Sequence, residues 1–332
     1  MMNPKPIRIA QVGAGHDHAT AAFASMRKQT DQFDLIGIAE PDAAFAGRLH
    51  GWPYDGAAVY TVEQLLDMNL DAVAVETAEE DATRTAQLFA DRGVAVYMDK
   101  PGSPDIAAFD RLADTLERQH LAFQMGYMYR FNPEIRRAMA MIAAGELGEI
   151  YSVEAHMSVH HDPAKRAWLG KYPGGMMYFL GCHLIDLVYR IQGAPMRVRA
   201  MNCATGAEGV DAPDYGFAVL EYPHGVSIVK SCAREVNGFD RRQLVICGSK
   251  GTVELRPLER HDGHGCETTG VRTALIGGTE TRMSAPFDRY DEMMRTFAQI
   301  VRGERVNEFD YDYERQLFHL VMRCCGAEQE GI

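Results

Sequence analysis

Two residues far apart in the chain have the chemistry of a proton-transfer site. Lys100 follows the apolar run Val94–Met98, where a lysine can hydrogen-bond a substrate hydroxyl. His183 follows a glycine-rich segment, and a neutral histidine can take the proton of an alcohol as its hydride leaves. Each has a simpler explanation when taken alone, as a surface lysine or as a buried structural histidine. If both belong to one site, its chemistry would be the oxidation of an alcohol or its reverse.

A turn near the N-terminus indicates where a nucleotide would bind. It comprises Gly13, Ala14, Gly15, His16, Asp17 and His18, directly after the apolar run Ile7–Val12 and before a helical pattern. Gly13 permits a tight turn, and Gly15 allows the backbone to approach a pyrophosphate at the helix N-terminus. His18 replaces the third small residue of the usual fingerprint. The prediction of a nucleotide site therefore depends mainly on the strand before the turn and the helix after it.

An acidic residue predicts which nucleotide is bound. Glu40 follows the apolar run Phe33–Ala39. A carboxylate there can hold both hydroxyls of an adenosine ribose, whereas it would repel a 2′-phosphate, and no arginine follows at once. We therefore expect NAD, with NADP the less favoured alternative. Without the glycines, a solvated carboxylate at a strand end would explain Glu40 equally well.

Alternating strand and helix patterns must position these residues. Apolar runs lie at 7–12, 33–39, 72–75, 94–98 and 121–125, and segments of helical spacing at 17–29, 62–68, 79–92 and 105–119. This alternation predicts a doubly wound parallel sheet, a Rossmann domain, over residues 1–125. Thr61 with Gln64 predicts a capping box, and Ser103 before Pro104 predicts a helix N-cap.

The pattern changes after residue 125. We expect helices near 133–144 and within 174–192, and a strand over 150–159. Two hairpins, 215–222 with 226–233 and 244–247 with 252–255, predict an open and mainly antiparallel sheet. Residues 126–332 would then form an α+β domain for substrate binding and oligomerisation. Its closing helices, near 288–302 and 312–328, could pack back on the first domain.

Composition excludes several classes of protein. The 332 residues carry 34 Lys and Arg against 46 Asp and Glu, a net charge of −12, which disfavours nucleic-acid binding. The longest apolar run, Ala138–Ala144, is far shorter than the roughly 18 residues that a membrane helix needs. The 7 cysteines form no CxxC pair, so we expect reduced thiols and a cytoplasmic protein without membrane partners.

The motifs together resemble the Gfo/Idh/MocA oxidoreductases, which include glucose–fructose oxidoreductase and inositol dehydrogenase. The resemblance runs essentially end to end. It rests on GAGHDH at 13–18, DKP at 99–101, GYMYRFNP at 126–133, GELGEIYSVEAH at 145–156, GGMMYFLGCHLIDL at 174–187 and CGSKGTVEL at 247–255. It implies an N-terminal Rossmann domain, a C-terminal domain built on an open sheet, and a homodimer or homotetramer formed through that sheet.

The resemblance also implies roles for individual residues. Lys100 matches the lysine of the family's E-K-P motif, which binds the reacting hydroxyl, and His183 matches the catalytic histidine. It places Tyr127, Arg130, Asn132 and Asp186 around the substrate, and Thr77 and Lys100 beside the cofactor.

The chain departs from the family at a position that bears on catalysis. Phe179 stands where relatives such as inositol dehydrogenase have an aspartate, and phenylalanine can neither orient the imidazole nor raise its basicity. Ala78 replaces a proline, and Ala82 a common histidine. Tyr178 could supply a hydroxyl instead, but we favour packing in the core.

Two further groups could contact a ligand. His156 and His160, with Ser158 between them, would share one face of a strand. With His183 they could bind a metal, but we favour a polar substrate pocket or a sheet-to-loop boundary, and we expect no metal. A second group, Trp168, Lys171 and Tyr172, could bind a sugar ring or anchor a loop.

The prediction is an NAD-dependent oxidoreductase for a carbohydrate-like substrate. It would transfer a hydride between nicotinamide and a secondary alcohol or ketone of a sugar, polyol or related cyclic compound. Two alternatives stay open: a non-catalytic NAD(H)-binding sensor or scaffold, and an NAD-dependent glycoside-cleaving enzyme.

Overall fold

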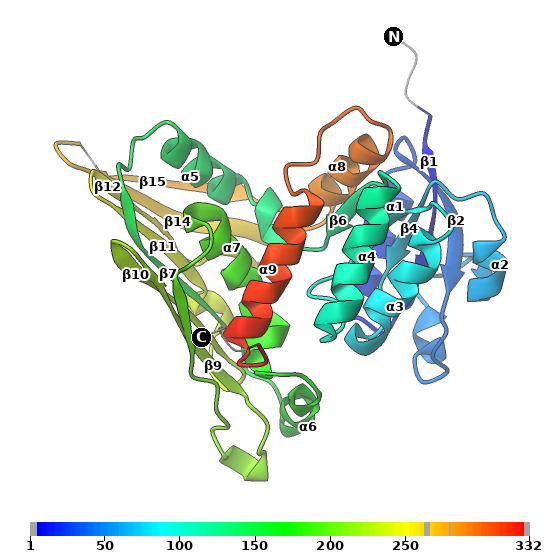
Figure 1. The fold of residues 1–332 in the computed structure, drawn as a ribbon, viewed down its shortest axis with the longest axis horizontal. Helices are drawn as coiled ribbons and strands as arrows, with labels where there is room; N and C mark the ends of the chain where they lie inside the picture. The colour runs from blue at the N-terminus through cyan, green and yellow to red at the C-terminus, as the bar shows by residue number, and fades with distance from the viewer. Residues whose placement is uncertain (1–4, 262–265, 279, 329–332) are drawn as a thin grey trace. The chain divides into compact units, whose positions relative to one another are not determined.

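The chain divides into two units, each built on its own sheet (Figure 1). The computed structural model describes residues 5–261, 266–278 and 280–328. Unit 1 comprises Met1–Tyr127 with Tyr290–Phe318, and unit 2 comprises Met128–Arg289 with His319–Ile332.

A six-stranded parallel sheet forms the centre of unit 1. Its strand order is β3-β2-β1-β4-β5-β6. The strands are β1 (Ile7–Val12), β2 (Phe33–Ala39), β3 (Val59–Tyr60), β4 (Ala72–Val75), β5 (Ala95–Met98) and β6 (Phe123–Met125). The predicted Rossmann sheet is thus confirmed. Strand β3 was not predicted, because two residues are too few to show a periodicity.

Helices cover this sheet. They are α1 (Ala19–Lys28), α2 (Val62–Leu66), α3 (Glu79–Ala90), α4 (Ile106–Arg118), α8 (Asp291–Val301) and most of α9 (Tyr311–Cys324). All residues of β4 and β5 are buried, as expected for central strands covered on both faces. Ser25 of α1 donates a hydrogen bond to Asp291 of α8 (2.8 Å), and Phe109 of α4 stacks on Phe318 of α9.

The helix caps show one correct and one wrong prediction. Thr61 and Gln64 form the capping box of α2. Ser103, however, does not cap α4, because the side chain of Asp105 accepts the N–H of Ala108 and the helix begins at Ile106. Aspartate is as good an N-cap as serine, and the Ser103 N–H is held instead by the hydroxyl of Thr83 (3.0 Å).

A nine-stranded sheet forms the centre of unit 2. Its order is β13-β14-β12-β11-β7-β10-β9-β8, with β15 paired to β14. The strands are β7 (Ile150–Ser158), β8 (Arg197–Ala200), β9 (Tyr215–Tyr222), β10 (Gly225–Cys232), β11 (Gln243–Gly248), β12 (Gly251–Leu255), β13 (Arg260–His261), β14 (Cys266–Leu275) and β15 (Thr281–Pro286). Only the β7–β10 pair is parallel among the pairings described, so the mainly antiparallel prediction is confirmed.

The helices of unit 2 are α5 (Pro133–Ala143), α6 (Pro163–Trp168) and α7 (Cys182–Gln192). Helix α7 packs on β7 and β10, and α5 packs on β12, β14 and β15. Short 3₁₀ turns lie at Ala46–Leu49, Met128–Phe131, Leu169–Lys171, Ala207–Gly209 and Phe239–Arg241 of the two units. Within the described ranges, none of the helices combines the length and apolarity needed to cross a membrane.

Candidate active site

The glycine turn is shaped by its contacts with the end of β4. Gly13 has φ +96°, and a Cβ on it would lie 2.3 Å from the backbone nitrogen of Thr77. A Cβ on Gly15 would lie 2.8 Å from the ring of Phe45. Both glycines are therefore required by packing inside unit 1, in addition to any approach of a ligand.

Glu40 is bonded into this turn. Its carboxylate accepts the N–H of Ala14 and the N–H of Asp42, the latter at 2.8 Å. Partial burial raises the pKa of Glu40, and the two backbone hydrogen bonds oppose that rise. The carboxylate thus lies against the glycine turn at the end of β2, the position from which it was expected to contact a ribose.

Arg48 adds a cation beside the turn. Its Nη1 donates hydrogen bonds to the carbonyls of Ala14 (2.8 Å) and Gly15 (2.9 Å), and its guanidinium lies 4.7 Å from the centre of the Phe45 ring. Arg48 does not directly follow Glu40 in the sequence, so its place beside the turn was not predicted. A cation at this position could offset the repulsion between Glu40 and a 2′-phosphate.

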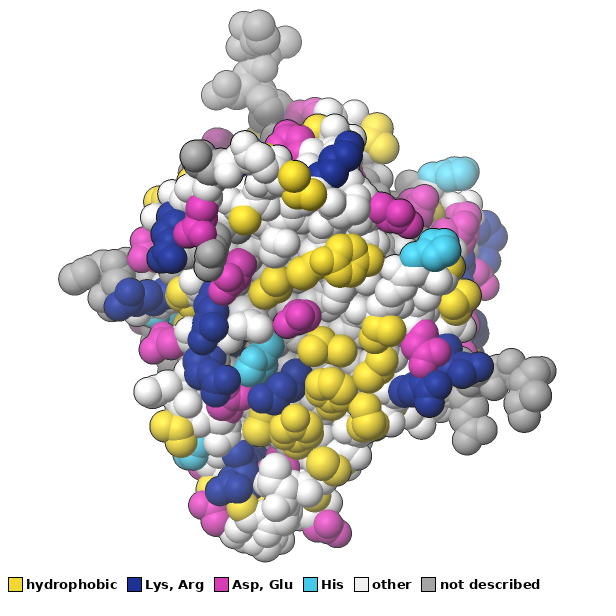
Figure 2. Space-filling view, turned by 90° about the vertical axis from the view of Figure 1, so that its left-hand side faces the viewer, with side chains coloured by type: hydrophobic (Ala, Val, Ile, Leu, Met, Phe, Trp, Pro, Cys, Tyr) yellow, Lys and Arg dark blue, Asp and Glu magenta, His cyan; other side chains and the backbone are white. Residues whose placement is uncertain are grey.

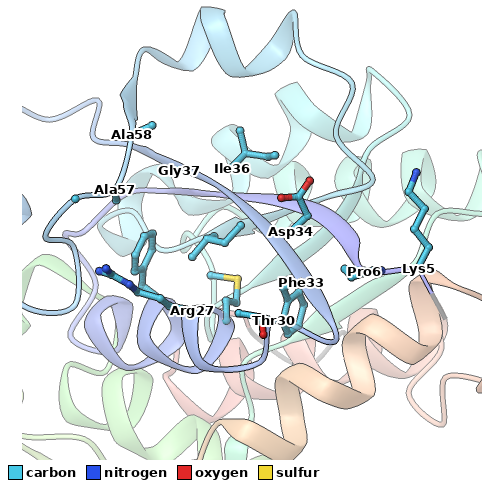
Figure 3. A pocket seen from close by; sticks show the side chains of 14 residues that line it. Lys5, Pro6, Arg27, Thr30, Phe33, Asp34, Ile36, Gly37, Ala57 and Ala58 are labelled. Carbon is cyan, nitrogen blue, oxygen red and sulfur yellow. The ribbon is translucent and has the colours of Figure 1, made fainter. Parts of the chain in front are cut away.

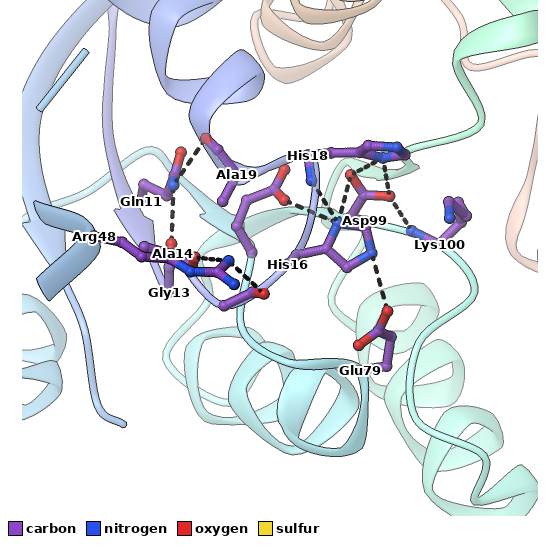
Figure 4. A network of polar contacts seen from close by, with 12 residues as sticks. Gln11, Gly13, Ala14, His16, His18, Ala19, Arg48, Glu79, Asp99 and Lys100 are labelled. Atoms are coloured by element: carbon purple, nitrogen blue, oxygen red, sulfur yellow. Dashed lines mark hydrogen bonds and ion pairs between the residues drawn. The ribbon is translucent and has the colours of Figure 1, made fainter. Parts of the chain in front are cut away.

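The histidines of the turn point to the end of β5 (Figure 4). The Nδ1 of His18 lies 3.1 Å from Oδ2 of Asp99, and the Nδ1 of His16 lies 3.5 Å from the same oxygen. Burial disfavours the charge of Asp99, but His16, His18 and Lys100 together outweigh it and hold the pKa of Asp99 below its usual value. Burial lowers the pKa of His18 against the attraction of Asp99. Asp17, between the histidines, is exposed.

Lys100 lies at the carboxyl edge of the parallel sheet. Its side chain is buried, with 1% of the residue exposed, and its backbone N–H donates to Oδ1 of Asp99 (2.7 Å). Thr77 lies at the same edge after β4, beside Gly13, and its buried hydroxyl has no hydrogen-bond partner among the described residues. Ligands of open α/β sheets bind outside this edge, so the buried hydroxyl fits a polar ligand group. Tyr127, also buried, closes the first segment of unit 1.

Two carboxylates that the sequence analysis did not select join this cluster. Glu76 Oε2 lies 3.6 Å from Nδ1 of His16, and Glu79 Oε1 lies 3.7 Å from Nε2 of the same ring. Burial and the charge of Asp99 raise the pKa of Glu76 well above its usual value. A glutamate at the end of the apolar run 72–75, one residue before Thr77, was the available signal.

The charged residues predicted in unit 2 contact each other. The guanidinium of Arg130 donates to both oxygens of Asp186 at 2.8–3.1 Å, and both side chains are fully buried. Asn132 caps α5 by accepting the N–H groups of Glu134 and Ile135. Arg130, Asp186 and Asn132, which were predicted to bind substrate, therefore have structural roles within unit 2.

His183 lies in the first turn of α7, where a π-helical turn at Met177–Gly181 leads into the helix. The imidazole is buried and contacts the ring of Tyr129 edge-on, with centroids 5.2 Å apart. The turn before it needs glycine: Gly175 has φ +49°, and a Cβ there would lie 2.1 Å from the carbonyl of Pro213. Asp186 shares the helix, as expected, but faces Arg130.

Aromatic side chains surround Phe179. Trp168 packs edge-on against it at 5.5 Å, and the Nζ of Lys165 lies 3.7 Å from the Trp168 ring and 4.5 Å from the Phe179 ring. Tyr178 stacks on Tyr172 at 5.2 Å. Trp168 and Tyr172, two of the three residues predicted to contact a sugar ring, thus lie in one cluster with Phe179, whereas Lys171 is exposed.

The two histidines predicted to share a strand face differ in their surroundings. The Nε2 of His156 lies 2.9 Å from the hydroxyl of Ser158 and 3.0 Å from Glu235. His160 lies beyond the end of β7, is exposed, and forms an isolated bridge with Arg234.

A cavity of about 750 Å³ lies elsewhere in unit 1 (Figure 3). It is lined by residues of α1 and β2 and by the loop at 56–58, both apolar, such as Phe23 and Met26, and charged, such as Lys5, Arg27 and Asp34. No residue of the glycine turn lines it. It is therefore separate from the expected nucleotide site.

Comparison with known proteins identifies the family. A model described as the oxidoreductase family with an NAD-binding Rossmann fold matches residues 7–127, and one described as the GFO/IDH/MocA C-terminal domain matches residues 135–254. The chain belongs to the GFO/IDH/MocA oxidoreductase family. Its N-terminal unit is accordingly an NAD-binding Rossmann domain, and the resemblance noted in the sequence is confirmed.

Individual family members are similar over most of their length. D-xylose 1-dehydrogenase (NADP(+)) 2 of Haloferax volcanii is 27% identical over 91% of each chain. Inositol 2-dehydrogenase of Rhizobium meliloti is 25% identical over 74% of each chain. The WlbA dehydrogenase of Bordetella pertussis, solved with NADH and UDP-GlcNAcA, has a TM-score of 0.78 at 18% identity, covering 99% of this chain and 98% of that one. This last likeness is one of fold.

Proposed function

We propose that this family member is an NAD-dependent oxidoreductase acting on a secondary alcohol or ketone of a sugar, polyol or related cyclic compound. The observation that carries the proposal is Lys100, a buried lysine at the carboxyl edge of the Rossmann sheet, next to the glycine turn and Thr77. An ammonium group there can hold the oxygen atom whose carbon gains or loses a hydride.

The cofactor assignment rests on the turn. A bound NAD would accept or donate the hydride. Gly13, Gly15 and the residues up to His18 would face its pyrophosphate, Glu40 its adenosine ribose, and the unpartnered hydroxyl of Thr77 another polar group. Arg48 leaves NADP as the alternative, and the Haloferax relative is named for NADP.

The proton would pass through unit 2. His183 would take the proton of the substrate hydroxyl during oxidation and return it during reduction. The Arg130–Asp186 pair would fix α7 and thereby His183, so that both act as positioning residues. Trp168 and Tyr178 would contact the substrate ring.

A specific observation favours a second candidate, a non-catalytic NAD(H) sensor or scaffold. The position one helical turn before His183 is occupied by Phe179, which packs against Trp168 and Lys165 and provides no carboxylate. A glycoside-cleaving activity is the third candidate.

A substrate screen separates these functions. The purified protein is incubated with NAD⁺ or NADP⁺ and a panel of sugars, polyols and glycosides, and the absorbance of reduced nicotinamide is followed. The proposal predicts net reduction with at least one polyol or sugar. Release of free sugar without net reduction would indicate glycoside cleavage, and nucleotide binding without any turnover would indicate a sensor.

We also propose that the protein forms a homodimer or homotetramer through the open face of the sheet in unit 2. Phe217, Val219 and Ile228 lie on that face and are half-buried, with Arg199 and Lys230 beside them. Figure 2 shows apolar side chains gathered on one face of the molecule, with Lys and Arg side chains nearby. Sedimentation of the wild type and of Val219→Glu tests it, and two monomeric proteins would contradict it.

A further inference from the structure

The histidine cluster under the glycine turn has the geometry of a metal site. His16, His18 and Asp99 each offer a ligand atom, and these atoms lie within 4.8 Å of one another. The three polar contacts that join them and Glu76 measure 3.1, 3.5 and 3.6 Å. Ligands at about 2.0–2.1 Å from a tetrahedral Zn²⁺ are separated by about 3.4 Å, so these spacings fit one ion.

The site is built from rigid and buried parts. Asp99 Oδ1 accepts the N–H of Lys100, which directs Oδ2 toward both histidines. A Cβ on Gly126 would lie 2.9 Å from the Asp99 carboxylate, so this glycine leaves room beside it. His16 is 4% exposed and Asp99 3%. Buried ligands on fixed backbone are the condition for a tight metal site.

A second observation points to a cation. Glu76 is 0% exposed, and neither oxygen of its carboxylate has a hydrogen-bond partner among the described residues, although one faces His16 at 3.6 Å. A buried carboxylate without partners is costly, and coordination of a metal is a common compensation. Nε2 of His16 also lacks a hydrogen bond in the described residues and faces Glu79.

We infer that His16, His18 and Asp99 bind a divalent first-row transition metal of the zinc type, with the buried carboxylate of Glu76 facing His16 beside the site. The donor set of two imidazoles and one carboxylate suits Zn²⁺ and its neighbours better than Mg²⁺ or Ca²⁺, which prefer oxygen ligands alone. The backbone N–H of His18 donates a hydrogen bond to Nδ1 of His16 (3.2 Å). A bound ion would take the lone pair of this nitrogen in place of that hydrogen bond. Glu79 would orient the other side of the His16 ring.

The metal would fix the conformation of the glycine turn from beneath, through side chains, while the backbone of the turn stays available to a pyrophosphate. The inference uses only residues of unit 1 and does not depend on the proposed oxidoreductase reaction. It is tested without nucleotide, so that its failure and the failure of the proposed function are distinguishable.

The test is a metal titration of the full chain without a histidine tag. The protein is stripped with a chelator, loaded with Zn²⁺ or Co²⁺, and dialysed. The inference predicts about one Zn²⁺ per chain and the intense visible absorption of tetrahedral Co²⁺. His18→Ala and Asp99→Asn should abolish retention, and Glu76→Gln should weaken affinity about 10–100-fold, by analogy with loss of a supporting ligand. His50→Ala, which removes an exposed histidine of the same unit, should bind like the wild type.

Two outcomes would overturn the inference. One is a wild type that retains no metal and gives only the weak spectrum of hydrated Co²⁺. The other is equal retention by the wild type and by folded His18→Ala and Asp99→Asn proteins, with folding checked by circular dichroism. Because the wild-type spectrum needs no variant, a variant that fails to fold leaves the inference testable.

Discussion

The buried charges of the two units are arranged differently. In unit 2 they are paired: Arg130 with Asp186, Arg166 with Asp214, and Arg242 with Glu259. In unit 1 the buried carboxylates of Glu76 and Asp99 face two histidines, and the carboxylate of Glu76 accepts no hydrogen bond from the described part of the chain. Paired buried charges are explained by the fold itself. Unsatisfied ones are expected where a ligand completes the site.

The largest expected effect concerns Lys100, which is buried beside Asp99 in unit 1. Lys100→Met keeps an apolar stem of similar length and removes the ammonium group. Turnover on the best substrate of the panel should fall about 10²–10³-fold, the usual effect of removing one group that holds the reacting oxygen, while NADH binding survives. Initial rates and a nucleotide titration of the same preparation measure both. Retained turnover, or a loss of nucleotide binding, would count against the role given to Lys100.

The next effect concerns a paired charge of unit 2. Arg130→Ala leaves Asp186 buried and uncompensated, so the free energy of unfolding should fall by about 3–5 kcal/mol. Urea unfolding measures it. Arg295→Ala is the matched control, because its pair with Glu292 is half-exposed and contributes about 0–1 kcal/mol. Equal losses in the two variants would show that the Arg130–Asp186 pair has no special structural role.

Cofactor choice gives a smaller effect at the edge of the glycine turn. Glu40→Ser removes the carboxylate that would repel a 2′-phosphate and leaves Arg48 in place. The ratio of NADPH to NADH affinity should rise about 10-fold, which corresponds to about 1.4 kcal/mol. The double variant with Arg48→Ala should lose most of that gain. An unchanged ratio in Glu40→Ser would remove Glu40 from the account of cofactor preference.

The smallest effect tests a local correction. Asp105→Ala removes the N-cap of α4 and should cost about 0.5–2 kcal/mol of unfolding free energy, whereas Ser103→Ala, at the position that the sequence favoured, should cost less. Thermal unfolding of both variants compares them. A larger loss in Ser103→Ala would restore the original prediction.

What the sequence could predict depended on how strongly burial marks a segment. The central strands β4 and β5 are buried on both faces and appear as continuous apolar runs, so the Rossmann sheet was predictable. Strand β15 is largely exposed and polar, and β8 likewise presents no apolar alternation, so neither was predicted. Their pairing is fixed by neighbouring strands rather than by their own pattern.

The site shows the same limit. Gly13, Gly15 and Lys100 were found because a turn and a strand end have fixed places in an α/β sheet. Glu76 and Arg48 were missed, since their importance comes from side chains that meet residues distant in sequence. Likewise, nothing in the sequence indicated that Arg130 and Asp186 bind each other.

The central claim is that the glycine turn of unit 1 binds a dinucleotide. Fluorescence titration with NADH and with NADPH, on protein stripped of any co-purified nucleotide, tests it most directly. The account predicts saturable binding of both the wild type and Lys100→Met to NADH, with NADH preferred over NADPH. If neither NADH nor NADPH bound, the claim would be contradicted, and the turn would be a structural feature of the sheet alone.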